Sequence, residues 1–140
     1  MMEQLFNMNL KGHVKITDLS GKVYYDDHND IAEGALLYLA HIMSNNSNYH
    51  FTKIKTLYGV GGEWETLITN TEVDNIFVKF QTVIPAGGGY EGTISGLQLL
   101  LANENIFSSV SGLDFEKLIG ISLQISWTIH LLNANCEPWA

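Results

Sequence analysis

Hydrophobic and polar side chains alternate strictly near the C-terminal end of the chain, over residues 121–131. The six odd-numbered positions carry Ile, Leu or Trp, and the even-numbered positions carry Ser, Gln, Thr or His. Successive side chains of a β-strand point to opposite faces, so this pattern predicts a strand with one fully apolar face. Burying one large apolar side chain contributes roughly 1.5–3 kcal/mol, so the face needs an opposing layer. A β-sandwich or a closed sheet is the first expectation.

The same two-residue period recurs upstream and predicts further strands between glycine- and asparagine-rich turns. Residues 10–17 alternate, and the turn chemistry of 18–21 predicts a hairpin whose second arm begins at 22–25. Residues 70–75 are polar and predict a turn, and 113–119 fit either an exposed loop or a short helical turn. Further strands are expected at 51–58, 76–84, 93–101 and 106–110, with 64–68 as a short strand or an extended loop.

One helix is expected, over residues 31–43, where apolar side chains recur at three- and four-residue spacing. Asp30 followed by Glu33 is typical of a capping box at the start of this helix. We therefore interpret the acidic segment 26–30 as a turn and helix cap. A calcium site at Asp26 and Asp27 is the alternative, although the alternating ligands and the glycine of a calcium loop are missing.

These elements together predict a mainly β protein: an antiparallel β-sandwich, immunoglobulin-like or related, with one α-helix near residues 31–43. A chain of 140 residues is long enough for one domain with its own core. We place that domain at residues 9–132, preceded by an N-terminal arm (1–8) and followed by a C-terminal tail (133–140).

Composition and charge narrow the possible partners. The net charge is −8, the seven cationic residues are all lysines and there is no arginine, which argues against nucleic acid as a partner. Only 16% of the residues are charged, so much of the surface is uncharged and suited to burial against other subunits. The single cysteine, Cys136, excludes an intrachain disulfide and a cysteine zinc site. We expect neither a membrane span nor a secretory signal.

The sequence holds no pattern that predicts catalysis, a metal or a cofactor. The five histidines are scattered without metal-ligand spacing, and a Gly-x-Ser-x-Gly nucleophile motif is absent. We expect His41, which lies at the edge of the apolar face of the predicted helix, to have a structural packing role. The candidate interface residues are the large apolar side chains Leu5, Phe6, Trp64 and Trp139, because aromatic groups dominate contacts between proteins.

The order of several short motifs resembles a small β-rich module of tailed bacteriophages, found in tail-tip, baseplate and fibre-attachment proteins. The matching segments cover most of residues 9–132: a hairpin leading through Asn-Asp-Ile to an Ala- and Leu-rich helix (29–43), a strand ending in glycines (54–62), and a strand running to Ile-Pro-Ala-Gly (77–87). They continue with Gly-Thr-Ile-Ser-Gly-Leu (92–97), Asn-Ile-Phe-Ser-Ser-Val (105–110), Phe-Glu-Lys (115–117) and Leu-Gln-Ile-Ser-Trp-Thr-Ile (123–129). Size brings the chain nearest to the small collar proteins of T-five-like siphophages.

The resemblance implies a non-enzymatic virion protein that assembles in the host cytoplasm. Its expected partners are further copies of itself in a homo-oligomeric ring, a tail tube or distal tail protein, and a side tail fibre protein. The alternative is a carbohydrate-binding β-sandwich that uses Trp64, Tyr90 or Trp139 as a stacking platform, with calcium at Asp26 and Asp27. An enzyme with a dispersed active site is a third, weaker hypothesis.

Overall fold

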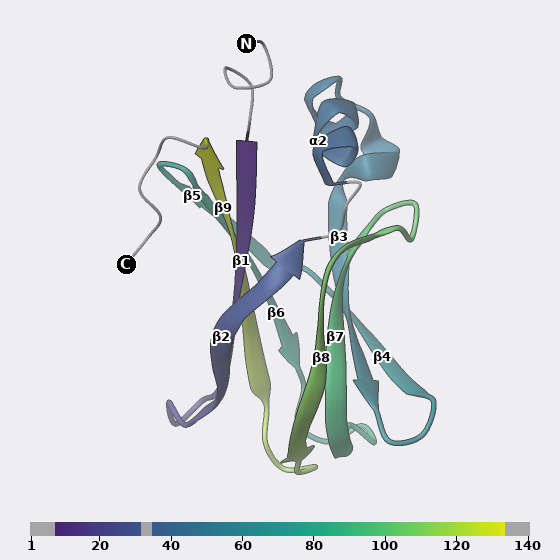
Figure 1. The fold of residues 1–140 in the computed structure, drawn as a ribbon. Coiled ribbons are helices and arrows are strands. Elements are labelled where there is room, and N and C mark those ends of the chain that lie inside the picture. The colour runs from purple at the N-terminus through teal and green to yellow at the C-terminus, as the bar shows by residue number, and fades with distance from the viewer. Residues whose placement is uncertain (1–7, 32–34, 134–140) are drawn as a thin grey trace.

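The computed structural model describes residues 8–31 and 35–133, and Figure 1 shows their arrangement. These residues form nine strands, one α-helix and a short 3₁₀ helix. The elements in chain order are β1 (Met8–Asp18), β2 (Val23–Ile31), α2 (Ala35–Met43), η1 (Ser47–Tyr49), β3 (Phe51–Tyr58), β4 (Gly62–Leu67), β5 (Asn70–Asp74), β6 (Phe77–Ile84), β7 (Gly92–Leu101), β8 (Ile106–Lys117) and β9 (Leu123–Asn133).

The strands form two antiparallel sheets that pack as a β-sandwich, which confirms the predicted fold class. One sheet has the order β2-β1-β9-β6-β5, and the other has the order β4-β3-β7-β8. The last two residues of β2 leave the first sheet and pair with β8, joining the two layers along one side. Figure 1 shows α2 at the end of the sandwich where β3 begins.

The apolar face of β9 lies in the core, as its alternation predicts. Leu123, Ile125, Trp127 and Ile129 are all buried. The strand is central because β1 pairs with it on one side and β6 on the other. Its polar face is half-buried, except that His130 is almost completely buried.

The hairpin between β1 and β2 is confirmed, and the side chain of Asp18 explains its turn. The Asp18 carboxylate accepts hydrogen bonds from the backbone N–H of Ser20 (2.9 Å) and of Lys22 (3.0 Å). The hydroxyl of Ser20 donates a third, at 2.6 Å. Gly21 takes a positive φ of 90°, which glycine adopts without steric cost.

The interpretation of residues 26–30 as a turn and helix cap is wrong, because this segment continues β2. Asp30 and Ile31 both lie in the strand, so the helix does not start at residue 31 as the sequence predicts, and α2 is described over Ala35–Met43. Pairing with β1 over residues 23–29 satisfies the backbone groups there, so long-range pairing prevails over the local capping preference. The end of the helix is as expected, since Asn45 takes a positive φ of 64° just beyond it.

Two further segments are strands where the sequence predicts otherwise. Residues 70–74 form β5, an edge strand paired only with β6, in place of a turn. Residues 113–117 belong to β8, which continues past a bulge at Gly112 instead of ending at residue 110. The first segment is polar and the second follows a glycine, so neither shows a strand pattern in the sequence. Pairing with β6 and with β7, respectively, makes each of them a strand. Within the described residues, no helix has the length and apolar character needed to cross a lipid bilayer.

Candidate functional site

Trp64, the one predicted interface residue within the described part of the chain, is largely covered by its own subunit. It is 8% exposed, and the ring of Tyr58 stacks on it with a centroid distance of 4.0 Å and an interplanar angle of 18°. Tyr90 approaches the same indole edge-on, at 5.5 Å. This geometry leaves little of Trp64 for a partner and argues against it as a sugar-stacking platform. Leu5, Phe6 and Trp139 lie outside the described residues.

Two glycines make room for the Tyr58 ring in this aromatic cluster. A Cβ atom on Gly62 would lie 2.6 Å from the ring, and one on Gly92 would lie 2.9 Å from it. Real Cβ contacts are not that short, so any larger residue would displace the ring. The sequence indicates that the glycine segment ending at Gly62 closes a strand, but the contact of Gly62 and Gly92 with Tyr58 depends on a fold that brings residues 58 and 92 together.

A buried lysine fixes the loops beside the aromatic cluster. Lys117, at the end of β8, is 2% exposed, and its ammonium donates hydrogen bonds to the carbonyl oxygens of Tyr90 (2.7 Å) and Leu118 (3.0 Å). Burial lowers the pKa of Lys117, and the nearby carboxylate of Glu91 opposes that shift. The backbone N–H of Gly87 also donates to the carbonyl of Ile119. The β6–β7 loop is therefore tied to the β8–β9 loop. Sequence reasoning missed Lys117, because an isolated lysine gives no sign that it will be buried.

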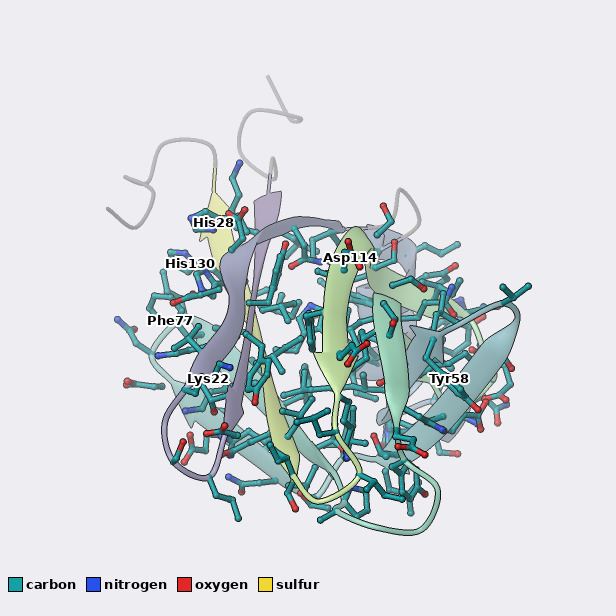
Figure 2. All side chains as sticks on the ribbon, turned by 90° about the horizontal axis from the view of Figure 1, so that it is seen from below. Lys22, His28, Tyr58, Phe77, Asp114 and His130 are labelled. Atoms are coloured by element: carbon teal, nitrogen blue, oxygen red, sulfur yellow. The ribbon has the colours of Figure 1, made fainter. Side chains whose placement is uncertain are left out.

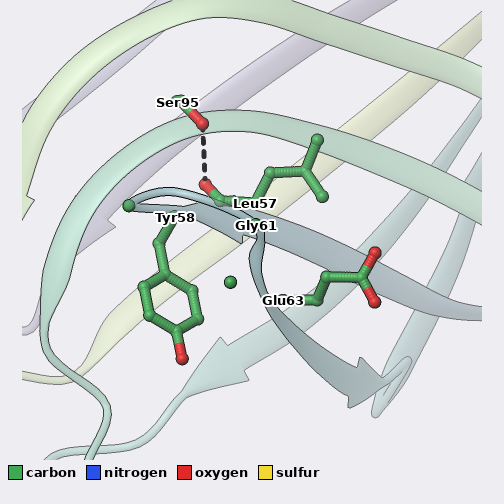
Figure 3. A pocket seen from close by; sticks show the side chains of 7 residues that line it. Leu57, Tyr58, Gly61, Glu63 and Ser95 are labelled. Atoms are coloured by element: carbon green, nitrogen blue, oxygen red, sulfur yellow. Dashed lines mark hydrogen bonds between the residues drawn. The ribbon is translucent and has the colours of Figure 1, made fainter.

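A pocket of about 200 Å³ lies at the turn between β3 and β4. Leu57, Tyr58, Glu63 and Ser95 line it together with the turn glycines. The hydroxyl of Ser95 donates to the carbonyl of Leu57 at 3.3 Å, which ties β7 to the base of the turn. Figure 3 shows the phenol ring of Tyr58 and the carboxylate of Glu63 reaching out on opposite sides of the turn. The ring of Tyr58 stacks inward on Trp64, whereas Glu63 lies on the outward face beside Lys55, so the two groups do not face each other across the pocket.

Exposed apolar side chains lie in the β3–β4 and β8–β9 loops, which Figure 1 shows at the same end of the sandwich. Val60 is fully exposed at the β3–β4 turn, and Leu118 and Ile119 are exposed in the loop after β8. We define the loop platform as Tyr58, Val60, Tyr90, Leu118 and Ile119, whose loops are linked by the contacts of Trp64 and Lys117. Surfaces of this composition, aromatic and aliphatic with few charges, are typical of contacts between proteins.

The histidines, scattered in the sequence, gather in part on the outer face of the first sheet. His13 on β1 lies 2.5 Å from the carboxylate of Asp26 on β2, and its ring meets His28 edge-on at 5.0 Å. His130 on β9 stacks on Phe77 with a centroid distance of 4.1 Å, and burial lowers its pKa. Figure 2 shows His28, His130 and Phe77 on one side of the molecule and Tyr58 on the other.

These histidines do not form a metal site within the described residues. No group of three or more His, Cys, Asp or Glu side chains suitable for holding a metal ion occurs there. This includes the neighbourhood of Asp26 and Asp27, where a calcium site was the alternative interpretation. The prediction that His41 packs structurally is confirmed, because its ring stacks on the ring of Tyr49 with a centroid distance of 4.1 Å.

Comparison of the chain with protein-family models, with curated proteins and with solved structures finds no match. The fold and the loop platform therefore have to be interpreted on their own chemistry.

Proposed function

We propose that this chain is a non-enzymatic structural protein of a bacteriophage tail, which forms a collar or baseplate ring of identical copies and anchors tail fibres. The proposal rests on the ordered motifs described above and on the surface of the domain. Over residues 8–31 and 35–133 the chain forms a β-sandwich with one α-helix, the fold that the resemblance implies. That fold alone is compatible with many functions, so the surface carries the argument.

The observation that carries the proposal is the amount of large apolar surface left open to solvent. In addition to the loop platform, Leu19 at the first hairpin, Met43 at the end of α2 and Val73 on β5 are each more than 70% exposed. Single exposed apolar residues are ordinary, but groups at the ends and edges of a domain are typical of subunits that bury them on assembly. Contacts between copies and with neighbouring tail proteins would cover these side chains.

Multi-angle light scattering of the purified chain across a micromolar concentration range tests the assembly. We expect a defined mass at a multiple of the 15.6 kDa subunit, either alone or after addition of a tail tube or side tail fibre protein. Replacing Val60 and Ile119 by serine should reduce that mass, whereas Thr93→Ser on the outer face of β7 should leave it unchanged. A monomer at high micromolar concentration that also fails to associate with tail proteins would contradict the proposal.

The alternative function, a calcium-assisted carbohydrate-binding module, receives less support. The indole of Trp64 is covered by Tyr58, and the described residues gather no calcium-binding group at Asp26 and Asp27. Tyr90 is only half-buried, so this alternative can be tested as a sugar contact at Tyr90. Binding in a glycan array that is lost on Tyr90→Ala would favour it.

A further inference from the structure

We infer that the edge strand β5 receives an additional antiparallel strand from a different protein, one that carries basic residues on its outer side. The inference goes beyond the proposed function, because a single copy of the domain would bind such a strand whether or not copies assemble. It rests on the direction of the backbone groups of β5, on the exposure of its inner side and on its charge.

The hydrogen bonds of β6 show which of its residues bond to β5. Leu131 of β9 donates its N–H to the carbonyl of Ile76, which continues the β6–β9 register by one residue. Hydrogen-bonded pairs alternate along an antiparallel ladder, so the even-numbered residues of β6 bond to β9 and the odd-numbered ones bond to β5. In agreement with this, the N–H of Thr69 donates to the carbonyl of Gln81.

This alternation leaves two residues of β5 with backbone groups that point away from the sheet. Asn70, Glu72 and Asp74 lie opposite odd-numbered residues of β6 and bond to them. The N–H and C=O groups of Thr71 and Val73 therefore point to the outer edge. Among the described residues, β6 is the only strand that pairs with β5. Two donors and two acceptors are thus open to an added strand, and strand addition at a sheet edge is a recurrent mode of peptide recognition.

The inner side of β5 is left uncovered by the opposite sheet. Val73 lies opposite Val78 and Thr71 lies opposite Phe80, so all four side chains point to the inner side of the sheet. Phe80 is 5% exposed, whereas Val73 is 73% exposed. β5 therefore extends past the edge of the core. An apolar side chain on an added strand would cover Val73 there.

The outer side of β5 carries an excess of negative charge. Glu72 lies 3.0 Å from the ammonium of Lys79 on β6. None of the ion pairs between described residues includes Asp74. Both acidic side chains are exposed. Basic residues on the outer side of an added strand would lie directly across from these two carboxylates, and such cross-strand pairs of opposite charge are stabilising.

A second copy of this chain fits the edge poorly. Antiparallel pairing that uses the open groups of both Thr71 and Val73 would place Glu72 directly opposite its equivalent in the second copy, and like charges in that position are destabilising. A register shift of two residues places Glu72 opposite Asp74. The opposite shift places Val73 opposite Thr69, whose N–H already bonds to β6.

The lysines of the chain lie elsewhere in the fold. All seven are within the described residues, and there is no arginine. Six of them belong to strands that are paired within the domain, and Lys22 lies in the turn between β1 and β2. The added strand therefore comes from a different protein, and the net charge of −8 favours the approach of a basic one.

An NMR titration of the full chain tests the inference with a synthetic peptide, Ac-Lys-Val-Lys-Val-Thr-NH2. Aligned antiparallel to β5, its lysines lie opposite Asp74 and Glu72, and its first valine lies opposite Val73. We expect saturable shifts of the amide signals of residues 70–74. Amide hydrogen exchange at Thr71 and Val73 should slow by about tenfold when nine-tenths of the chain is bound, whereas exchange at Glu72, which bonds to β6, should change little.

Two modified peptides separate backbone pairing from attraction between charges. Methylation of both valine nitrogens removes the N–H donors that would bond to β5, so binding should be lost although the charge is the same. Replacement of both lysines by glutamate should also abolish saturable binding. If the methylated peptide binds as tightly as its parent, or if exchange at Thr71 and Val73 is unchanged at saturation, the inference is wrong. Protection of these two amides that rises with protein concentration in the absence of peptide would show a second copy at the edge instead.

A variant of the protein tests the contribution of charge. Asp74→Asn should weaken binding of the peptide about fivefold, the loss expected for one exposed ion pair. The matched control is Asp114→Asn on β8, which removes the same charge from an exposed carboxylate on the other sheet and should leave binding unchanged. Equal effects of the two variants would show a general attraction to the negative domain and would overturn the inference.

Discussion

Two buried threonines differ in whether their hydroxyl group is hydrogen-bonded. Replacing each of them by valine should therefore change the free energy of unfolding in opposite directions. Thr56 on β3 and Thr82 on β6 are both completely buried. The hydroxyl of Thr82 donates to the carbonyl of Leu67 at 2.7 Å. The hydroxyl of Thr56 has no hydrogen-bond partner among the described residues. Valine has nearly the same shape as threonine, so each substitution mainly removes the hydroxyl.

The expected magnitudes follow from these two environments. Burying a hydroxyl without a hydrogen bond costs about 1–3 kcal/mol, so Thr56→Val should raise the free energy of unfolding by roughly 1–2 kcal/mol. Thr82→Val should lower it by about 1 kcal/mol, because it removes a hydrogen bond and leaves the carbonyl of Leu67 without this donor. For a domain of this size, 1 kcal/mol corresponds to a change in Tm of about 3–4 °C.

Urea denaturation followed by tryptophan fluorescence measures both free energies. The two variants should keep the slope of the unfolding free energy against urea and shift the midpoint in opposite directions. If Thr56→Val destabilises the chain as much as Thr82→Val does, the hydroxyl of Thr56 must be hydrogen-bonded in solution, and the reasoning from its burial is refuted. A changed slope would instead indicate an altered unfolded or native state.

Three other perturbations have defined outcomes. Gly62→Ala should lower the free energy of unfolding by about 1–3 kcal/mol, because the added Cβ would lie 2.6 Å from the Tyr58 ring. In the control Gly120→Ala the added Cβ meets no atom within 4 Å, so the free energy of unfolding should change by less than about 0.5 kcal/mol. Urea denaturation of the two variants measures both changes. Burial lowers the pKa of His130, so below the usual histidine pKa of 6.5 the unfolded chain binds more protons than the folded chain does. The midpoint of urea denaturation should therefore decrease between pH 7.5 and pH 5. In His130→Leu this decrease should be smaller. Lys117→Met removes two donors to loop carbonyls, so amide hydrogen exchange in the β6–β7 loop should accelerate by roughly tenfold, with unchanged exchange in β9 as the control.

The sequence predicts the strands whose two faces differ strongly. Residues 10–17 and 121–131 alternate regularly, and the structure has strands at Met8–Asp18 and Leu123–Asn133. Strands without that contrast are missed. Residues 26–30 carry good helix-capping residues, and β5 is exposed at all five positions. Pairing with β1 and β6 decides these segments, and their partners lie at a distance along the chain that local patterns do not encode.

The candidate site is predictable only in its composition. Aromatic and glycine residues near 58–64 and 85–92 are evident in the sequence, but their contacts depend on the register of β3 with β4 and β7. That register brings Ser95 of β7 to the carbonyl of Leu57 and places Glu63 beside Lys55. The same limit applies to His13 and Asp26, which meet only because β1 and β2 form a hairpin.

Core stability and assembly depend on different parts of this molecule, and the proposed experiments can separate them. Thr56 lies in the core, so its replacement by valine should change the free energy of unfolding and leave the assembled mass intact. Val60 and Ile119 are exposed in loops, so their replacement by serine should reduce that mass and leave the free energy of unfolding within about 0.5 kcal/mol. If the serine variants lowered stability and mass together, the loss of assembly would reflect disturbed loops. Direct contacts of these two side chains with a neighbouring subunit predict the loss of assembly alone.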